Sequence, residues 1–153
     1  MTKKEQFIEE LNSRYKTKGT FITLGKAILD GEVLPEVDIN IPDKSPAEAI
    51  LRDEIRKHLD ALPSIANVML KLSLPTINNL YKEFTHHPRV VRVVALSGGY
   101  PREKANAILA ENKGVIASFS RALTEGLSAT QTDEQFNNAL AHTVEGIYEA
   151  SIK

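Results

Sequence analysis

The chain has no cysteine and almost no net charge, and each of these absences excludes certain kinds of site or binding partner. Without cysteine there is no disulfide framework and no thiolate metal site, and the composition fits a reducing compartment. Nineteen basic side chains against twenty acidic ones leave a net charge of -1, so no global field attracts nucleic acid or anionic lipid. Any anion site must therefore be local.

Long hydrophobic runs are missing as well. No apolar segment approaches the length of a membrane span, and the opening residues, MTKKEQFIEEL, form a charged amphipathic segment without the apolar stretch of a signal peptide. We therefore expect a cytoplasmic protein. The 153 residues are 42% hydrophobic and 25% charged, which is typical of one folded domain with a core of its own.

Helical and strand-like hydrophobic periods alternate along the chain. Short apolar strands are predicted over residues 37–40, 67–72, 90–96 and 114–118. Helices are predicted between them, over about 45–62, 77–85 and 102–111, and a long helix follows residue 132. This alternation predicts an α/β fold in which helices cover a parallel sheet that is either open or closed as a barrel.

Two of these helices carry recognisable start signals. Ser45, Pro46 and Glu48 predict a capping box with proline at the first helical position, and Thr132 with Gln135 predicts a second capping box. A helical spacing of apolar residues follows each start. The buried stripe expected for the last helix is Phe136, Leu140, Val144 and Ile147.

Polar residues follow the carboxyl ends of the strands, where parallel α/β folds place their chemistry. Ser97, Gly98 and Gly99 come between a strand and a helix, so their N–H groups can face one anion, with the positive end of the helix dipole behind them. A plain glycine turn is the simpler interpretation of this tripeptide alone. Arg121 follows the next strand, and an arginine beside a glycine-rich loop favours a phosphate site.

A single cation, Lys71, interrupts the apolar run NVMLKLSLP at residues 67–75. One interpretation places its amine in water at the end of the strand, with its stem along apolar surface. The other makes it a nucleophile that forms a Schiff base with a carbonyl on the molecule held by the phosphate loop. A carboxylate must then move protons. Glu36 and Asp38 are candidates, although a hydrated strand edge is the preferred interpretation of Asp38.

Four motifs taken together resemble one enzyme family. PEVDIN, NVMLKLSLP, RVVALSGGY and GVIASFSRALTEGL look like the C-terminal half of class I fructose-bisphosphate aldolases of the bacterial type, in order and without large gaps. The resemblance implies a parallel (β/α) half-barrel of the TIM-barrel type over 35–153, preceded by an atypical N-terminal helix and linker over 1–34. It also implies a glycolytic lyase that interconverts fructose 1,6-bisphosphate with dihydroxyacetone phosphate and glyceraldehyde 3-phosphate, with no metal or other cofactor.

The resemblance also assigns roles to residues. Lys71 matches the Schiff-base lysine, and Glu36 matches the second glutamate of the family's Glu-Pro-Glu motif, whereas Leu34 stands where the first glutamate, the main proton-transfer group, is expected. Both an active lyase and a non-catalytic scaffold or weak sugar-phosphate binder therefore remain open. The phosphate-binding residues that it implies are Ser97, Gly98, Gly99, Ser120 and Arg121.

Length bears on assembly. A complete barrel takes about 250 residues, so this chain cannot hold eight βα units. Four strands of a barrel leave unpaired edges near Val37 and Val115 and an open apolar face, which are not stable alone in water. We expect a homodimer that completes the barrel. The alternative is a compact monomer in which residues 20–24 add a fifth strand and the opening helix covers the face.

Overall fold

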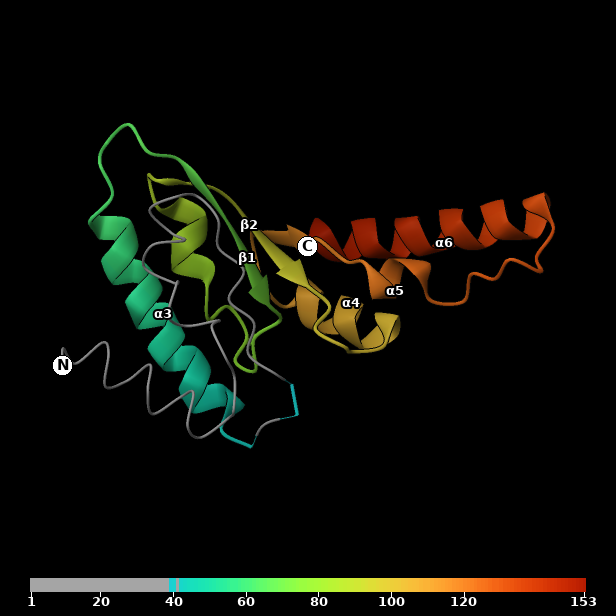
Figure 1. Cartoon of the computed structure of the whole chain (residues 1–153), viewed down its shortest axis with the longest axis horizontal. Helices are drawn as coiled ribbons and strands as arrows, with labels where there is room; N and C mark the ends of the chain where they lie inside the picture. The colour runs from blue at the N-terminus through green and yellow to red at the C-terminus, as the bar shows by residue number, and fades with distance from the viewer. Residues whose placement is uncertain (1–38, 41) are drawn as a thin grey trace.

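The computed structural model describes residues 39, 40 and 42–153, in which three parallel strands form one sheet in the order β1-β2-β3 (Figure 1). The strands are β1 (Val68–Ser73), β2 (Val90–Leu96) and β3 (Val115–Ala117). β1 pairs with β2, and β2 pairs with β3. This sequential parallel order confirms the predicted α/β class and is consistent with part of a half-barrel.

Helices precede, connect and follow the strands. They are α3 (Lys44–Asp60), the 3-10 helix η1 (Lys82–His86), α4 (Arg102–Ala110), α5 (Arg121–Thr124) and α6 (Asp133–Ser151). α3 comes before β1, η1 connects β1 to β2, and α4 connects β2 to β3. The alternation predicted from the hydrophobic period is therefore present from α3 onwards.

The predicted N-terminal features fall mostly outside the described residues. The helix and linker over 1–34, Glu36 and Asp38 all lie there, and so do the first two residues of the strand predicted over 37–40. The last two residues of that strand, 39 and 40, form part of a turn.

One face of the sheet carries the core. Leu70, Leu72 and Val93 are at most 1% exposed, and alternate residues of a strand point to the same side. The helical spacing of apolar residues predicted after the start of α3 is confirmed as a buried stripe, because its members belong to the same hydrophobic cluster as the strands. The helical members of that cluster include Leu51, Ile55, Leu59, Phe84 and Leu109.

The start of α3 differs from the prediction. The helix begins at Lys44, with Asp43 in the N-cap position, so Pro46 is its third residue and Ser45 is not a cap. Glu48 does not close a capping box, because it bonds to Lys44 and to the loop after β1. The carboxylate that the local sequence pattern assigned to the helix cap therefore forms a tertiary contact instead. At α6, by contrast, the predicted capping box is confirmed.

The helix predicted over about 77–85 is confirmed only in its last part, as the 3-10 helix η1, and is wrong for its first part. Asn79 has a φ of 63°, in the left-handed region that interrupts an α-helix. Its N–H donates to Asn112 Oδ1 at 2.9 Å, and its own Oδ1 accepts from the N–H of Lys113 at 2.9 Å. Turns therefore occupy the first part of the segment and η1 the last. The hydrogen bonds between this loop and the loop after α4 therefore hold a turn where the local sequence pattern predicted a helix.

α6 departs furthest from the prediction. Phe136 is 38% and Val144 49% exposed, although both were expected in a buried stripe, while Ile147 is partly buried. The N-terminal part of α6 projects away from the sheet, and its C-terminal end lies against β3 (Figure 1). The apolar spacing is that of a helix, as predicted, but the rest of the described chain covers that stripe only in part and leaves Phe136 and Val144 exposed.

Candidate functional site

The loop between β2 and α4 forms the predicted glycine turn. Gly98 has a φ of 64° and Gly99 a φ of 97°, values that L side chains rarely adopt. The turn is closed by the N–H of Tyr100, which donates to the carbonyl of Ser97 at 3.0 Å. A Cβ atom built on either glycine would lie 3.5 Å from the side chain of Ile39, so the turn packs against that residue on one side, while Gly99 remains exposed.

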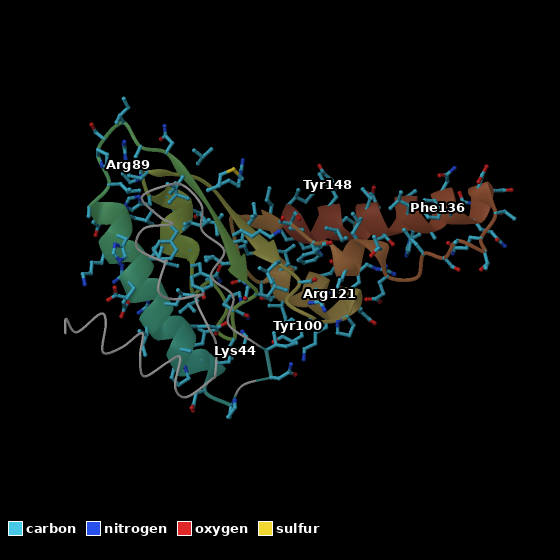
Figure 2. All side chains as sticks on the ribbon, in the orientation of Figure 1. Lys44, Arg89, Tyr100, Arg121, Phe136 and Tyr148 are labelled. Atoms are coloured by element: carbon cyan, nitrogen blue, oxygen red, sulfur yellow. The ribbon has the colours of Figure 1, made fainter. Side chains whose placement is uncertain are left out.

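Arg121 lies beside this turn. A Cβ atom built on Gly99 would be 3.9 Å from Arg121 Nη2, so the guanidinium borders the glycine backbone directly. Arg121 is the first residue of α5 and is exposed, whereas Ser97 is buried, and Ser120 directly precedes α5. Tyr100 and Arg121 mark this region in Figure 2. Two loops that the sequence linked only by their place after neighbouring strands are thus brought together.

Lys71 lies on β1, opposite Val94 of β2, on the face of the sheet away from the core. Burial along this face increases toward the carboxyl end of the strand: Met69 is 52% exposed, Lys71 is half-buried and Ser73 is 3% exposed. Lys71 therefore lies just inside the covered end, two residues before the strand stops. Ser73 in turn pairs with Leu96, the residue before the glycine loop.

No hydrogen bond or ion pair holds the Lys71 amine among residues 39, 40 and 42–153. A structural ion pair with a described carboxylate is therefore not the reason for a cation in this strand. Both interpretations from the sequence, a solvated amine and a nucleophile, are compatible with its half-buried position. Glu36, the carboxylate expected to work with it, and the other candidate, Asp38, lie outside the described residues.

Sequence reasoning missed a buried ion pair next to this edge of the sheet. Lys44 is 6% exposed and Glu48 is fully buried, and the two are bonded across one turn of α3. Lys44 Nζ also donates to the carbonyl of Leu74 at 2.9 Å, and Glu48 Oε2 accepts from the N–H of Thr76 at 2.9 Å. These hydrogen bonds hold the segment directly after β1 against α3. Its spacing of four residues was the only signal in the sequence, and an exposed pair has the same spacing.

The charge of Glu48 reaches the glycine loop. Burial, and after it the negative charge of Glu48, raises the pKa of Tyr100 above the ordinary tyrosine value. The same two causes, in the same order, raise the pKa of the buried Tyr81. Lys104 Nζ lies 4.8 Å from the centre of the Tyr100 ring, on the side of α4. Tyr100 thus connects the glycine loop to α4 through its contact with Lys104.

The described residues hold neither a ready metal site nor a membrane-spanning helix. Among them, no three histidine, aspartate or glutamate side chains are grouped as metal ligands. In the same part of the chain, no helix is both long enough and apolar enough to cross a membrane.

Comparison with known proteins bears on the family. No family model matches the chain. A "Fructose-bisphosphate aldolase class 1" of Porphyromonas gingivalis is 53% identical over 133 residues, which cover 84% of this chain and 45% of that protein. One from Clostridium acetobutylicum is 48% identical over 157 residues, covering 99% and 53%. The chain is similar to class 1 fructose-bisphosphate aldolases.

The similarity confirms the resemblance that the four motifs indicated. The chain spans about half the length of these curated aldolases. The glycine loop, Arg121 and Lys71 all lie within the motifs that carry the resemblance.

Proposed function

We propose that this chain acts on phosphorylated sugars as an aldolase-type half-barrel, with Lys71 as the Schiff-base nucleophile and the Ser97–Gly99 loop with Ser120 and Arg121 as the phosphate site. The observation that carries the proposal is the approach of Arg121 to Gly99, at the same edge of the sheet as Lys71. Both aldolase relatives support the substrate class by their names.

The phosphate site rests on charge and on open backbone. A guanidinium presents several N–H donors in a fixed plane and suits a phosphate, and a glycine turn adds backbone N–H groups. Neighbouring βα loops at the carboxyl ends of barrel strands are a common place for phosphate sites. In this chain the two loops follow β2 and β3.

The proposed reaction begins at Lys71. Its neutral amine attacks the carbonyl carbon of the ketose, water leaves, and a protonated imine forms. Cleavage of the carbon–carbon bond between the α and β carbons of the imine sends its electron pair toward the imine and gives an enamine on Lys71. The departing fragment leaves as an aldehyde when its hydroxyl loses a proton to a carboxylate, the role proposed for Glu36. Protonation of the enamine and hydrolysis then release dihydroxyacetone phosphate.

A second candidate function is binding without catalysis. Leu34 occupies the position where the family resemblance expects a proton-transfer glutamate, and general acid–base catalysis typically contributes about 10²–10⁴-fold in rate. The chain also spans only about half of its relatives. Under this alternative the phosphate loop and Arg121 still bind a sugar phosphate, but turnover is absent.

Assembly is part of the proposal. We propose a cytoplasmic homodimer in which two copies complete the barrel. β3 pairs on one side only within the described sheet, and a pocket of about 440 Å³ lies between β3 and α6. Apolar side chains line most of this pocket, among them Ile116, Phe119, Leu123, Val144 and Ile147.

The test is to incubate the chain with dihydroxyacetone phosphate, reduce it with borohydride and locate the adduct by mass spectrometry. The expected result is one stable adduct on Lys71, which is absent from a Lys71→Met variant that keeps its far-ultraviolet circular dichroism. Steady-state cleavage of fructose 1,6-bisphosphate separates the two candidates, because the binding-only form turns over no substrate. An adduct on Lys82 or Lys113 with Lys71 unmodified would contradict the assignment.

A further inference from the structure

The two loops of the proposed phosphate site are joined by a pair of side chains outside that site. Arg102, the first residue of α4, donates from its backbone N–H to Glu125 Oε2 at 2.9 Å. Its Nη1 donates to the carbonyl of Glu125 at 2.6 Å and, over a longer 3.4 Å, to the carbonyl of Ala122. Each residue thus uses its side chain to hold the backbone of the other. We call Arg102 and Glu125 the brace.

The brace lies close in sequence to both halves of the phosphate site. Arg102 comes three residues after Gly99, and Glu125 comes four residues after Arg121, at the end of α5. Neither loop is well fixed by itself, because glycines have no side chains to anchor and α5 has four residues, too few for a stable isolated helix. The spacing between Gly99 and Arg121 therefore depends on contacts from elsewhere.

The brace also changes how an anion would be held. The sequence predicted help from the positive end of the helix after the glycine loop. The first N–H of α4, however, already donates to the Glu125 carboxylate, whose negative charge offsets that end of the dipole. One nitrogen of the Arg102 guanidinium, Nη1, likewise donates to carbonyl oxygens. An anion at this site would be held by the glycine amides and Arg121.

We infer that Arg102 and Glu125 are positioning residues that keep Gly99 and Arg121 at the spacing at which one phosphate contacts both. This inference rests on the proposed phosphate site. The competing view is that the brace is an ordinary surface contact, of a kind that commonly contributes little beyond local stability.

The decisive experiment titrates the full ¹⁵N-labelled chain with inorganic phosphate and follows the amide signals of Gly98 and Gly99. Glu125→Ala removes the acceptor, and Glu125→Gln removes the charge but keeps an acceptor oxygen. If only charge mattered, both variants would bind phosphate more tightly, since a nearby anion is gone. The inference predicts about a fivefold weaker affinity for Glu125→Ala, the usual net effect of one hydrogen bond, and near-normal affinity for Glu125→Gln.

Arg102→Lys tests the other half of the brace. It keeps the positive charge, but the lysine amine ends short of the position of Nη1, the one atom that donates to both carbonyls, so it is also expected to weaken phosphate binding about fivefold. The matched control is another exposed arginine–glutamate pair, Arg56 with Glu83, whose two hydrogen bonds are both 2.6 Å and which joins α3 to η1. Arg56→Lys and Glu83→Gln are expected to leave phosphate affinity unchanged.

Normal affinity in Arg102→Lys, or tighter binding in Glu125→Ala, would overturn the inference. If the unmodified chain does not respond to phosphate at all, the proposed phosphate site fails, and with it the role of the brace in binding. The amide signals of Gly98 and Gly99 still report on the brace without phosphate. If these signals shift in Glu125→Ala but not in Glu125→Gln, the brace links the two loops. Unchanged signals in both variants would refute that link.

Discussion

The two sides of the described sheet are covered in very different ways. On the β1 side, α3 and η1 bury Ile55, Leu59 and Phe84 to 1% exposure or less. On the β3 side, α6 leaves an apolar stripe in solvent, with Val144 49% and Tyr148 57% exposed. Both sides use amphipathic helices, so the spacing of apolar residues does not explain the difference.

What differs is the surface available to each helix. α3 packs on a sheet face built by two paired strands with a continuous apolar layer, and its buried ion pair ties it to the loop after β1. β3 is three residues long and has one described neighbour. α6 has 19 residues and a complete capping box, so its start is stabilised locally even where its apolar face is open. A helix can therefore be well formed and still lack its partner surface.

The largest effect is expected from the buried ion pair on the closed side. Lys44→Met leaves the Glu48 carboxylate buried without its cation, and breaking such a pair typically destabilises by about 3–5 kcal/mol. In Lys44→Met/Glu48→Gln the buried charge is removed and the new side-chain amide keeps an oxygen for the N–H of Thr76, so a clearly smaller loss is expected. Urea unfolding followed by circular dichroism measures both. Equal losses in the single and double variants would show that the ion pair itself does not hold the loop.

The next prediction compares one residue from each side. Ile55→Ala empties a fully buried position and is expected to cost about 2–5 kcal/mol of unfolding free energy. Val144→Ala, on the open stripe, is expected to cost within about 0.5 kcal/mol in the isolated chain, as is usual for exposed positions. The same urea titrations provide the values. A large cost at Val144 that increases with protein concentration would mean that the stripe is covered by association.

The elements that could be predicted from the sequence are those defined by local pattern. The three described strands, the stripe of α3 and the capping box of α6 follow from residues close together in the chain, and the structure contains all of them. The proximity of Arg121 to the glycine loop was also foreseeable, because parallel strands align their carboxyl ends at one edge.

The errors other than the exposed stripe of α6 share a different cause. Glu48 was assigned to a cap, and it bonds instead to the backbone of Thr76, 28 residues away. Asn79 lies in a stretch predicted as a helix, and its contact with Asn112 fixes it in a turn. Arg102 and Glu125 gave no signal at all. Each of these cases involves a polar side chain that forms a hydrogen bond with backbone far away in the sequence. Hydrophobic periodicity gives no information about such hydrogen bonds.

The smallest effect on the fold, and the sharpest test of the comparison, comes from placing a charge on the open side. Val144→Glu adds a carboxylate to a half-exposed position in the apolar pocket between β3 and α6, so the chain itself is expected to unfold at nearly the same urea concentration. If two copies cover this pocket, the same carboxylate would be buried without a partner, which disfavours association strongly. Sedimentation equilibrium is therefore expected to give a dimer for the unmodified chain and a species near the chain mass of 16.9 kDa for Val144→Glu.

A matched change at an exposed position of α3, Ile50→Glu, is expected to leave the dimer intact, since that residue lies outside the pocket. An unmodified chain that stays monomeric at every concentration would refute the homodimer and favour the compact monomer, in which residues of the same chain must complete the sheet.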